Sequence, residues 1–503
     1  MWIKENGKFH AKYTYTELGN TKTKEYFDNG SLIMEKSISA DVYGRVTNVN
    51  YKNDAGNEIY STKLGFSNDL SSRVTSLDHS WSGVLNRGDV KRKGLYSYDY
   101  NDRLSNVVGS FAASYEFDEI GRMSKKVEGD DGIEFSYANP SYRPSGYSVN
   151  GESAAKDVEY FKYDASGNIW YDKHNKVVYK NSELGLPVKI TTFASMPSNI
   201  TLEDVNEEKD FANVESVVDV TYDEAGNRLW YSVDNRVRNE KRIEVTLSGI
   251  GVFKSQDVDA ANPAYELVRQ DLVAGAYRDA SGSAHFPVLD AQGSVRGYVT
   301  KSGLESAYDY YPYGTVVDVS PNAGDDNKRW QSKEFDNEHG KYYFGSRYFD
   351  PFFGMWMSPD PAGQFANPYS YGGDPVNFVD PNGEEALSAG VVVTAAIVGA
   401  IIGGASAAYQ CSKYGAGSCS VAVTQGIAVG AAAGAAGRAA GIAAGGAAAA
   451  YGSIDAAVAS GLASGTASSG NKLYWQWFIY RGYVLGRGCP RYSFRSSFGS
   501  SYC

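Results

Sequence analysis

Cysteine is absent from the first 383 residues of this 503-residue chain, and all four cysteines lie in residues 384–503. Charge divides at the same place. Residues 384–503 hold seven Lys/Arg and three Asp/Glu, a net charge of +4, which leaves −15 on residues 1–383 because the whole chain carries −11. Histidine is also missing after residue 383. The chain therefore consists of an acidic part and a basic part with different chemistry.

Other absences exclude whole classes of function. The chain holds no glycine-rich phosphate loop, no cluster of metal ligands and no nucleophile elbow of a hydrolase. We therefore expect no cofactor, no bound metal and no small-molecule substrate. Residues 1–7 (MWIKENG) lack an apolar segment and a small-residue cleavage site, so we expect no cleavable signal peptide there. The expected location is outside the cell, reached through a dedicated export system, or the cell surface or membrane.

The four cysteines, Cys411, Cys419, Cys489 and Cys503, show neither CxxC spacing nor the spacing of a metal site. In an exported segment they could form two disulfides by any of three connectivities. Disulfides and free thiols both remain open from the sequence.

Tyrosine and glycine are abundant instead, with 39 and 55 residues, which favours many short strands joined by tight turns. Six copies of one turn pattern recur along the chain: in five of them an Asp is followed three positions later by a Gly, and in the sixth Asp102 stands in the Gly position. The copies begin at Asp41, Asp99, Asp118, Asp164, Asp223 and Asp290, and an aromatic residue precedes the Asp in four of them. An Asp carboxylate can accept a backbone N–H two residues on, and Gly supplies a positive φ, so each copy predicts a β-hairpin.

These copies resemble the YD repeats of RHS and teneurin-type proteins, whose strands wind into a hollow β-shell. The resemblance covers about residues 35–300, and residues 50–95 and 190–215 fit it poorly, as insertions or worn repeats would. We therefore expect a mainly β fold, with an antiparallel β-shell of hairpin repeats over residues 1–284 ahead of a Gly/Ala-rich α-helical tail.

Residues 285–383 carry a more specific signature. Its blocks are HFPVLDAQGSVR (285–296), YDYYPYG (308–314), GSRYFDP (345–351), GMWMSPDP (354–361), NPYSY (367–371) and DPVNFVDPNG (374–383). In this order they closely resemble the RHS repeat-associated core, which in that family plugs the shell and marks the boundary between the scaffold and a variable tail.

The resemblance also implies a cleavage reaction. RHS proteins and the C components of insecticidal toxin complexes cut themselves just after the core, using an Arg of the RYxxP block and two Asp of later DP blocks. Carried over by motif, the candidate catalytic residues are Arg347, Asp360 and Asp380. Two adjacent carboxylates can share a proton, one acting as acid and the other as base, and an Arg can hold them by bidentate hydrogen bonds.

Two features of the sequence oppose this inference. The family usually has a Leu after the final DPxG, whereas Glu384 and Glu385 follow Gly383 here, and their charges should disfavour the approach of this segment to two acids. The Asp-Pro steps also suit a scaffolding role, because Pro fixes its own φ and restricts its neighbour. Autoproteolysis within a few residues after Gly383 and a purely structural role therefore both remain open.

Residues 384–470 are rich in Gly and Ala, and residues 386–408 and 414–437 contain no charge. The first of these runs is long enough to span a bilayer as a helix. Glycines recur four residues apart, as in Gly426, Gly430 and Gly434, and this spacing lets helices approach closely in lipid. We expect two or three membrane-interacting helices; the alternative is a packed helical linker or a low-complexity spacer.

Residues 471–503 are basic and aromatic, with Trp475 and Trp477 close to Arg481 and no acid. Such residues favour a membrane interface, and they also suit stacking and phosphate contacts with nucleic acid. Because the tail has no His and its three acids lie far from this segment in sequence, it lacks the usual acid–base groups of a nuclease. We expect its partner to be a target membrane and not a nucleic acid.

The sequence therefore predicts an RHS-type shell protein of the polymorphic-toxin kind, which encloses a membrane-active C-terminal effector and releases it by self-cleavage. A secretion-system or carrier component and an immunity protein are the further partners that this function implies. The alternative is a surface or structural YD-repeat protein whose tail is a membrane anchor or a decayed cassette, without toxicity or cleavage.

Overall fold

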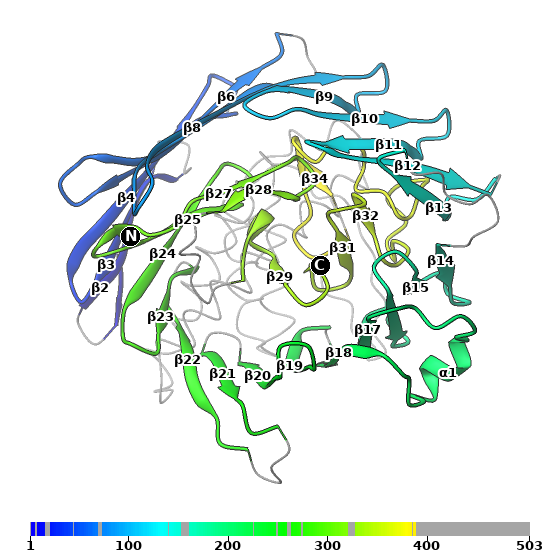
Figure 1. Cartoon of the computed structure of the whole chain (residues 1–503). Coiled ribbons are helices and arrows are strands. Elements are labelled where there is room, and N and C mark those ends of the chain that lie inside the picture. The colour runs from blue at the N-terminus through cyan, green and yellow to red at the C-terminus, as the bar shows by residue number, and fades with distance from the viewer. Residues whose placement is uncertain are drawn as a thin grey trace, which may run out of the picture.

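The computed structural model describes residues 2–388, apart from residues 6–7, 16–20, 44, 69–72, 139, 152–159, 225, 248–249, 259–262, 273–274, 320–326 and 385. The expected tail helices, the basic aromatic segment and the four cysteines lie outside the described residues. The described part is mainly β, as the sequence predicts. Its large antiparallel sheets form an arch around a smaller set of strands (Figure 1).

The first large sheet has 13 strands within the described residues, and each strand pairs with its neighbours in sequence. Its strands are β1 (Trp2–Glu5), β2 (Lys8–Tyr15), β3 (Thr21–Asp28), β4 (Ser31–Ala40), β5 (Val46–Asn53), β6 (Glu58–Phe66), β7 (Val74–Val84), β8 (Gly88–Tyr98), β9 (Leu104–Gly109), β10 (Ala113–Phe117), β11 (Met123–Glu128), β12 (Asp131–Tyr137) and β13 (Pro144–Val149). The sheet is thus a continuous antiparallel meander, the arrangement that successive hairpins produce.

The second large sheet repeats this plan with another 13 described strands. They are β14 (Phe161–Tyr163), β15 (Ile169–Asp172), β16 (Val177–Asn181), β17 (Pro187–Phe193), β18 (Val214–Tyr222), β19 (Arg228–Asn235), β20 (Glu240–Leu247), β21 (Gly251–Ser255), β22 (Glu266–Asp271), β23 (Tyr277–Asp279), β24 (Ala284–Leu289), β25 (Val295–Thr300) and β26 (Gly303–Leu304). The first residues that resemble the RHS core therefore form the last strands of this sheet.

The rest of the core folds inside the arch, where Figure 1 places β29, β31, β32 and β34. Its described elements are β27 (Tyr308–Tyr310), β28 (Val316–Val319), the 3₁₀ helix η2 (Trp330–Ser332), β29 (Glu334–Asp336), β30 (Lys341–Tyr343), β31 (Tyr348–Asp350), β32 (Met355–Trp356), β33 (Phe378–Val379) and β34 (Leu387–Ser388). Buried aromatic side chains around Trp330 and Trp356 pack these short strands together. The core is therefore held mainly by side chains and not by a large sheet of its own.

The Asp-x-x-Gly copies form the hairpin turns that the sequence predicts. At Asp118 the backbone N–H donates to the Arg122 carbonyl oxygen (2.9 Å), and the Gly121 N–H donates to the Asp118 carbonyl oxygen (3.0 Å). The Oδ1 atom of Asp118 accepts the N–H groups of Ile120 (3.2 Å) and Arg122 (2.8 Å). Gly121 has a φ of +86°, and in the sixth copy Asp102 takes the same left-handed conformation with a φ of +62°.

The aromatic residue before the repeat Asp joins one hairpin to the next. The hydroxyl of Tyr98, which precedes Asp99, donates to the Val74 carbonyl oxygen (2.6 Å), and the guanidinium of Arg73 lies 5.3 Å from the centre of the Tyr98 ring. The same stacking recurs before other repeat Asp residues, with Arg103 on Phe117 and Arg143 on Tyr163. The pairing of an aromatic with an Asp in the repeat thus supplies both the turn and the contact between turns.

The last strands of the second sheet return to the first sheet, beside β4 and β7 (Figure 1). The indole N–H of Trp81 donates to the carbonyl oxygen of Arg296 (2.7 Å). The Tyr51 hydroxyl exchanges hydrogen bonds with the backbone of Leu289, and an apolar cluster around Phe286 fills the space between the sheets. The two sheets therefore form one body.

The core is fastened to the side of the sheets on which the six repeat turns lie. The turns that begin at the six repeat Asp residues follow even-numbered strands of the two meanders, so in each sheet they lie at the same end of the strands. The hydroxyl of Tyr369 donates to the carbonyl oxygen of Gly167 (2.7 Å), and that of Tyr343 donates to the carbonyl oxygen of Gly226. The segments that carry the predicted cleavage residues are therefore positioned by the repeat turns themselves.

The segments that fit the repeat poorly have two different structures. Residues 50–95 form β5 to β8, and Asn53 takes the place of Asp in one turn, where the Gly56 N–H donates to the Asn53 carbonyl oxygen (3.0 Å). Residues 190–215 contain a short helix, α1 (Leu202–Asn206), capped by the Thr201 hydroxyl, which accepts the N–H of Asp204 (3.2 Å). Residues 50–95 therefore form a degenerate copy of the repeat, and residues 190–215 contain an insertion between β17 and β18.

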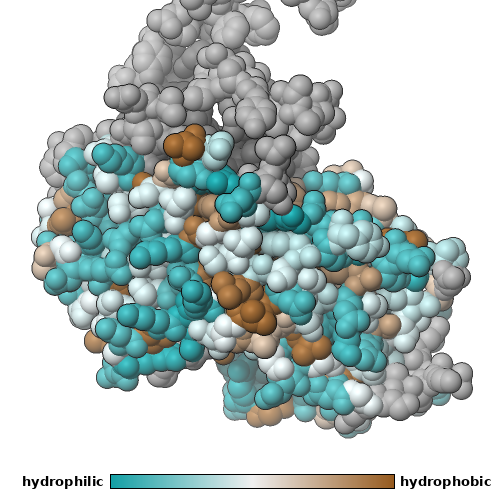
Figure 2. Space-filling view, turned by 90° about the horizontal axis from the view of Figure 1, so that it is seen from above, coloured by the Kyte–Doolittle hydropathy of each residue, from teal (hydrophilic) through white to brown (hydrophobic). Residues whose placement is uncertain are grey.

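The described residues hold no helix that is both long and apolar enough to cross a bilayer. They also hold no group of three or more His, Cys, Asp or Glu side chains placed to bind a metal. Seen from above, the described surface is largely hydrophilic, with hydrophobic residues in small separate patches (Figure 2). Membrane interaction of the tail stays a prediction, because the tail lies outside this part of the chain.

Candidate active site

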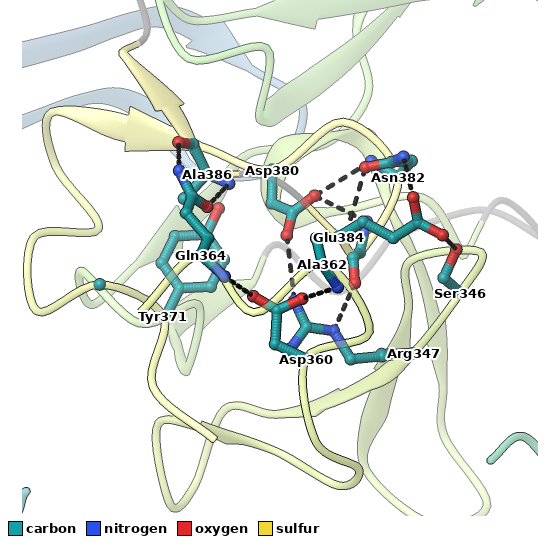
Figure 3. Close-up of polar contacts among 12 residues, drawn as sticks. Ser346, Arg347, Asp360, Ala362, Gln364, Tyr371, Asp380, Asn382, Glu384 and Ala386 are labelled. Atoms are coloured by element: carbon teal, nitrogen blue, oxygen red, sulfur yellow. Dashed lines mark hydrogen bonds and ion pairs between the residues drawn. The ribbon is translucent and has the colours of Figure 1, made fainter. Parts of the chain in front are cut away.

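The three residues predicted for self-cleavage converge inside the core (Figure 3). Arg347 precedes β31, Asp360 follows β32 and Asp380 follows β33. The Nη2 atom of Arg347 lies 3.5 Å from Oδ1 of Asp360 and 3.8 Å from Oδ2 of Asp380. The three side chains are 3%, 4% and 1% exposed, respectively. A single buried nitrogen thus faces both carboxylates, in place of the bidentate fork that the sequence suggests.

Arg347 also contacts the peptide at the predicted boundary of the tail. Its Nε–H donates to the carbonyl oxygen of Gly383, and its guanidinium lies 4.1 Å from the centre of the Trp356 ring. Burial lowers the pKa of Arg347, while the neighbouring carboxylates oppose that shift. A desolvated positive charge is therefore directed at the Gly383 carbonyl group, which it can polarise.

Asp380 is held by the loop that follows it. Its Oδ1 atom accepts the N–H groups of Gly383 (2.6 Å) and Asn382 (3.1 Å). The Asp380 N–H donates to Oε1 of Gln331 (3.0 Å), which also accepts the hydroxyl of Tyr371 (2.7 Å). Burial raises the pKa of Asp380 despite the opposing effect of the neighbouring Lys and Arg side chains. Asp380 is therefore suited to keep a proton.

Asp360 is oriented by backbone groups of its own loop. Its Oδ1 atom accepts the N–H of Ala362 (3.0 Å), and Oδ2 accepts the N–H of Gln364 (3.1 Å). The Asp360 N–H donates to the carbonyl oxygen of Pro368 (2.9 Å). The Asp-Pro step therefore serves as a turn and, at the same time, places the Asp360 carboxylate against Arg347.

The carboxylate of Glu384, the first of the two acids after Gly383, is bound by neighbouring side chains. The sequence suggests that Glu384 and Glu385 repel the site, but the Glu384 carboxylate accepts hydrogen bonds from the Ser346 hydroxyl (2.8 Å) and from Nδ2 of Asn382 (3.3 Å). Glu384 points toward Ser346, away from the paired aspartates (Figure 3). Its charge is thus held beside the site, and Glu385 lies outside the described residues.

The backbone around Gly383 fits closely against Arg347. Gly383 has a φ of +86°, and a Cβ atom there would lie 3.1 Å from both the Arg347 N atom and the Phe344 Cβ atom. On either side of this loop, β33 and β34 pair through Phe378 with Ser388 and Val379 with Leu387. The loop between the two strands therefore presents the Gly383 carbonyl to the site in a defined position.

Three residues that hold this arrangement were not indicated by the sequence. Gln331 binds the Asp380 N–H, Ser346 binds Glu384, and Gln364 binds the backbone of Ala386 through both ends of its amide. Each acts through one neutral side chain; Ser346 stands in the block GSRYFDP, but nothing in that block marks its hydroxyl as a binding group. Only the position of Gln364, four residues after Asp360, offered a signal.

Comparison with known proteins places the fold. No protein-family model matches the chain. The chain is 37% identical over 123 residues to salivary gland surface protein 1 of Aedes aegypti, which is 24% of this chain and 4% of that protein. It is 26% identical over 374 residues to the tRNA3(Ser)-specific nuclease WapA of Bacillus spizizenii, which is 60% of this chain and 16% of that protein.

A chain of the Photorhabdus luminescens Tc holotoxin pore, which contains TccC3, superposes with a TM-score of 0.61 at 17% identity. The superposition covers 77% of this chain and 20% of that chain. The two therefore share a fold. This chain spans only a small part of the length of each of these relatives.

Proposed function

We propose that this chain is the shell and core of an RHS-type, polymorphic-toxin-like protein that cuts itself after Gly383 and so releases the segment that follows. The fold shared with a Tc toxin chain and the similarity to a WapA nuclease support the RHS-type assignment. The observation that carries self-cleavage is that Arg347 contacts both buried carboxylates and the Gly383 carbonyl oxygen.

The proposed reaction is hydrolysis of the Gly383–Glu384 peptide bond by the Asp360–Asp380 pair. Asp360, ionised, removes a proton from water, whose oxygen forms a bond to the Gly383 carbonyl carbon. Arg347 stabilises the oxyanion through its Nε–H. Asp380, protonated because burial raises its pKa, donates its proton to the Glu384 nitrogen as the C–N bond breaks. The products are a new carboxyl terminus at Gly383 and a new amino terminus at Glu384.

The released segment is proposed to act on a membrane. WapA is named as a tRNA nuclease. In this chain, however, residues 384–503 contain no histidine and only three acids, and they include two long uncharged runs rich in Gly and Ala. These residues favour a target membrane over RNA as the partner. A carrier or secretion component and an immunity protein complete the proposal, together with a location outside the producing cell.

The test is intact mass of the purified full-length chain beside Asp360→Asn, with the exposed Asp210→Asn as a matched control. The wild type and the control should give two pieces that meet between Gly383 and Glu384, and Asp360→Asn should give one. Cleavage of Asp360→Asn at the wild-type rate would rule out the acid pair. A wild type that stays whole would overturn self-cleavage.

A second candidate function rests on the similarity to the Aedes aegypti protein, which is named as a surface protein. In that case the chain is a YD-repeat protein of the cell surface with its tail as an anchor. It would then be found as one uncut polypeptide in the membrane fraction of its cell.

A further inference from the structure

We infer that Gln364 is a positioning residue that holds the tail segment in register for cleavage; this inference rests on the proposed self-cleavage. The side-chain amide of Gln364 contacts one residue of that segment twice. Its Oε1 atom accepts the N–H of Ala386 (2.7 Å), and its Nε2–H donates to the Ala386 carbonyl oxygen (2.8 Å). The amide thus binds Ala386 as a neighbouring strand would.

Gln364 also orients one of the two acids. Its backbone N–H donates to Oδ2 of Asp360 (3.1 Å). One residue therefore joins the carboxylate that is proposed to activate water with the peptide three residues beyond Gly383. Figure 3 shows this chain of contacts, from Asp360 through Gln364 to Ala386. Gln364 therefore restricts movement of Ala386 relative to the Asp360 carboxylate, in addition to the pairing of β33 with β34.

The contact at Ala386 completes a set that holds the loop at both ends. Before the bond to be cut, Asp380 accepts the N–H of Gly383 (2.6 Å); after it, Ser346 binds Glu384 (2.8 Å) and Gln364 binds Ala386. Without the last contact, Ala386 is held only through its neighbours, Glu384 on one side and the paired strand β34 on the other, so the peptide can shift from its attack geometry. A displacement of about 1 Å can lower the rate about 100-fold.

This contact recognises only backbone atoms. The Gln364 amide requires a residue with an N–H and a carbonyl group at position 386, and it touches no side-chain polar group there. The structure therefore assigns to position 386 a specificity for any small residue other than proline. Ala386 is 7% exposed, which limits the size of the side chain. The core can thus process tails that differ in sequence beyond this point.

The experiment follows cleavage of the full-length chain over time after cell-free synthesis, with mass spectrometry of the pieces. Gln364→Ala should slow cleavage about 100-fold and spread the cut over neighbouring bonds. Ala386→Pro should slow it to a similar extent, Ala386→Ser should not, and the double variant Gln364→Ala with Ala386→Pro should be no slower than either alone. As a control, Gln292→Ala removes another amide contact to backbone, at Pro375 and Val376, and should leave the cut after Gly383.

A second measurement reports the contact without cleavage. In the Asp380→Asn chain, hydrogen exchange at the Ala386 amide should become about tenfold faster when Gln364 is changed to Ala. Unchanged exchange would overturn the contact. Wild-type cleavage rate and position in Gln364→Ala would overturn the positioning role while self-cleavage stands. A wild-type chain that is never cut would overturn both proposals together.

Discussion

The Nε–H of Arg347 donates to the carbonyl oxygen of Gly383, across 36 residues of sequence. The same side chain lies within ion-pair distance of Asp360 and Asp380 through a different nitrogen. A guanidinium holds its N–H groups on separate nitrogens in one fixed plane, so Nε and Nη2 can face the carbonyl and the carboxylates at once, whereas the three N–H groups of a Lys ammonium share one nitrogen. This relationship makes the geometry of Arg347 as important to the proposed reaction as its charge.

Arg347→Lys should therefore slow self-cleavage about 100-fold or more, the effect expected from loss of one oxyanion donor. The measurement is the rate at which the two pieces accumulate. Arg45→Lys is a matched control, because Arg45 pairs with Asp41 (2.6 Å) at a repeat turn away from this site. Equal cleavage rates for Arg347→Lys and the wild type would contradict polarisation of the carbonyl by Arg347.

Self-cleavage should slow as pH rises. Burial raises the pKa of Asp380, and the proposed reaction needs Asp380 protonated, so the active form is lost as pH rises through that raised value. Cleavage rates measured at about pH 5 and about pH 9 should differ in favour of the acidic sample, since an ordinary Asp titrates near pH 4. A rate that increases steadily over this range would show that Asp380 is not the acid.

Arg228→Met should destabilise the fold by about 3–5 kcal/mol at neutral pH, because it removes the Arg partner of the buried Asp336 and of the partly buried Glu334. The Arg228 side chain is 7% exposed. Its Nη1 atom lies 2.7 Å from Oδ2 of Asp336 and its Nη2 atom lies 2.5 Å from Oε2 of Glu334, so Arg228 joins β19 to β29 of the core. The measurement is urea unfolding. Arg236→Met, at an exposed Arg 3.7 Å from Asp234, is the control and should change stability by less than about 1 kcal/mol.

The loss of unfolding free energy caused by Arg228→Met should become smaller as pH falls. Burial alone would raise the pKa of Asp336 and of Glu334, but Arg228 outweighs it and both pKa values are lowered. The stability from these pairs is therefore present above the ordinary carboxyl pKa of about 4 and is lost as pH falls through the lowered values. If the stability difference between Arg228→Met and the wild type stays constant down to about pH 3, it arises from packing alone.

Gly121→Ala should destabilise the shell by about 1–2 kcal/mol through backbone strain alone. Gly121 has a φ of +86°, and the nearest atom to an added Cβ is Nη1 of Arg103 at 3.8 Å, so space is available. Gly132→Ala is the matched control: Gly132 lies in β12 at an ordinary φ, with its nearest neighbour, Asn150, at 3.6 Å. Unfolding should show a loss of stability for the first variant and a small gain for the second.

The repeat turns could be predicted from sequence because their causes are local. The carboxylate of Asp118 binds N–H groups two and four residues away, and Gly121 supplies the positive φ within the same turn. Even the exception at Asp102 follows a local rule, since Asp tolerates the left-handed conformation better than most residues. The mainly β fold and the succession of hairpins follow from these turns.

The residues proposed for cleavage were indicated by their motifs, but their geometry could not be predicted. Arg347, Asp360 and Asp380 come from three separate loops of the core and meet only in the folded protein, in which Tyr343 and Tyr369 fasten the core to repeat turns. The sequence places two negative charges after Gly383, and only the folded loop turns the Glu384 carboxylate toward Ser346. The sequence gives the charge of Glu384, but the orientation of its carboxylate depends on the packing of the folded loop.

By itself, then, the sequence determined local features, which are the hairpins from Asp-x-x-Gly and the division into an acidic part and a basic part. Its resemblance to the RHS core indicated the three residues that we propose for self-cleavage. The tertiary structure decided which polar side chains are buried and which groups they contact. Burial makes Asp380 the carboxyl group suited to keep a proton, and the fold alone brings Gln364 to the backbone of Ala386. Those properties depend on contacts between segments far apart in the chain, and no local pattern contains them.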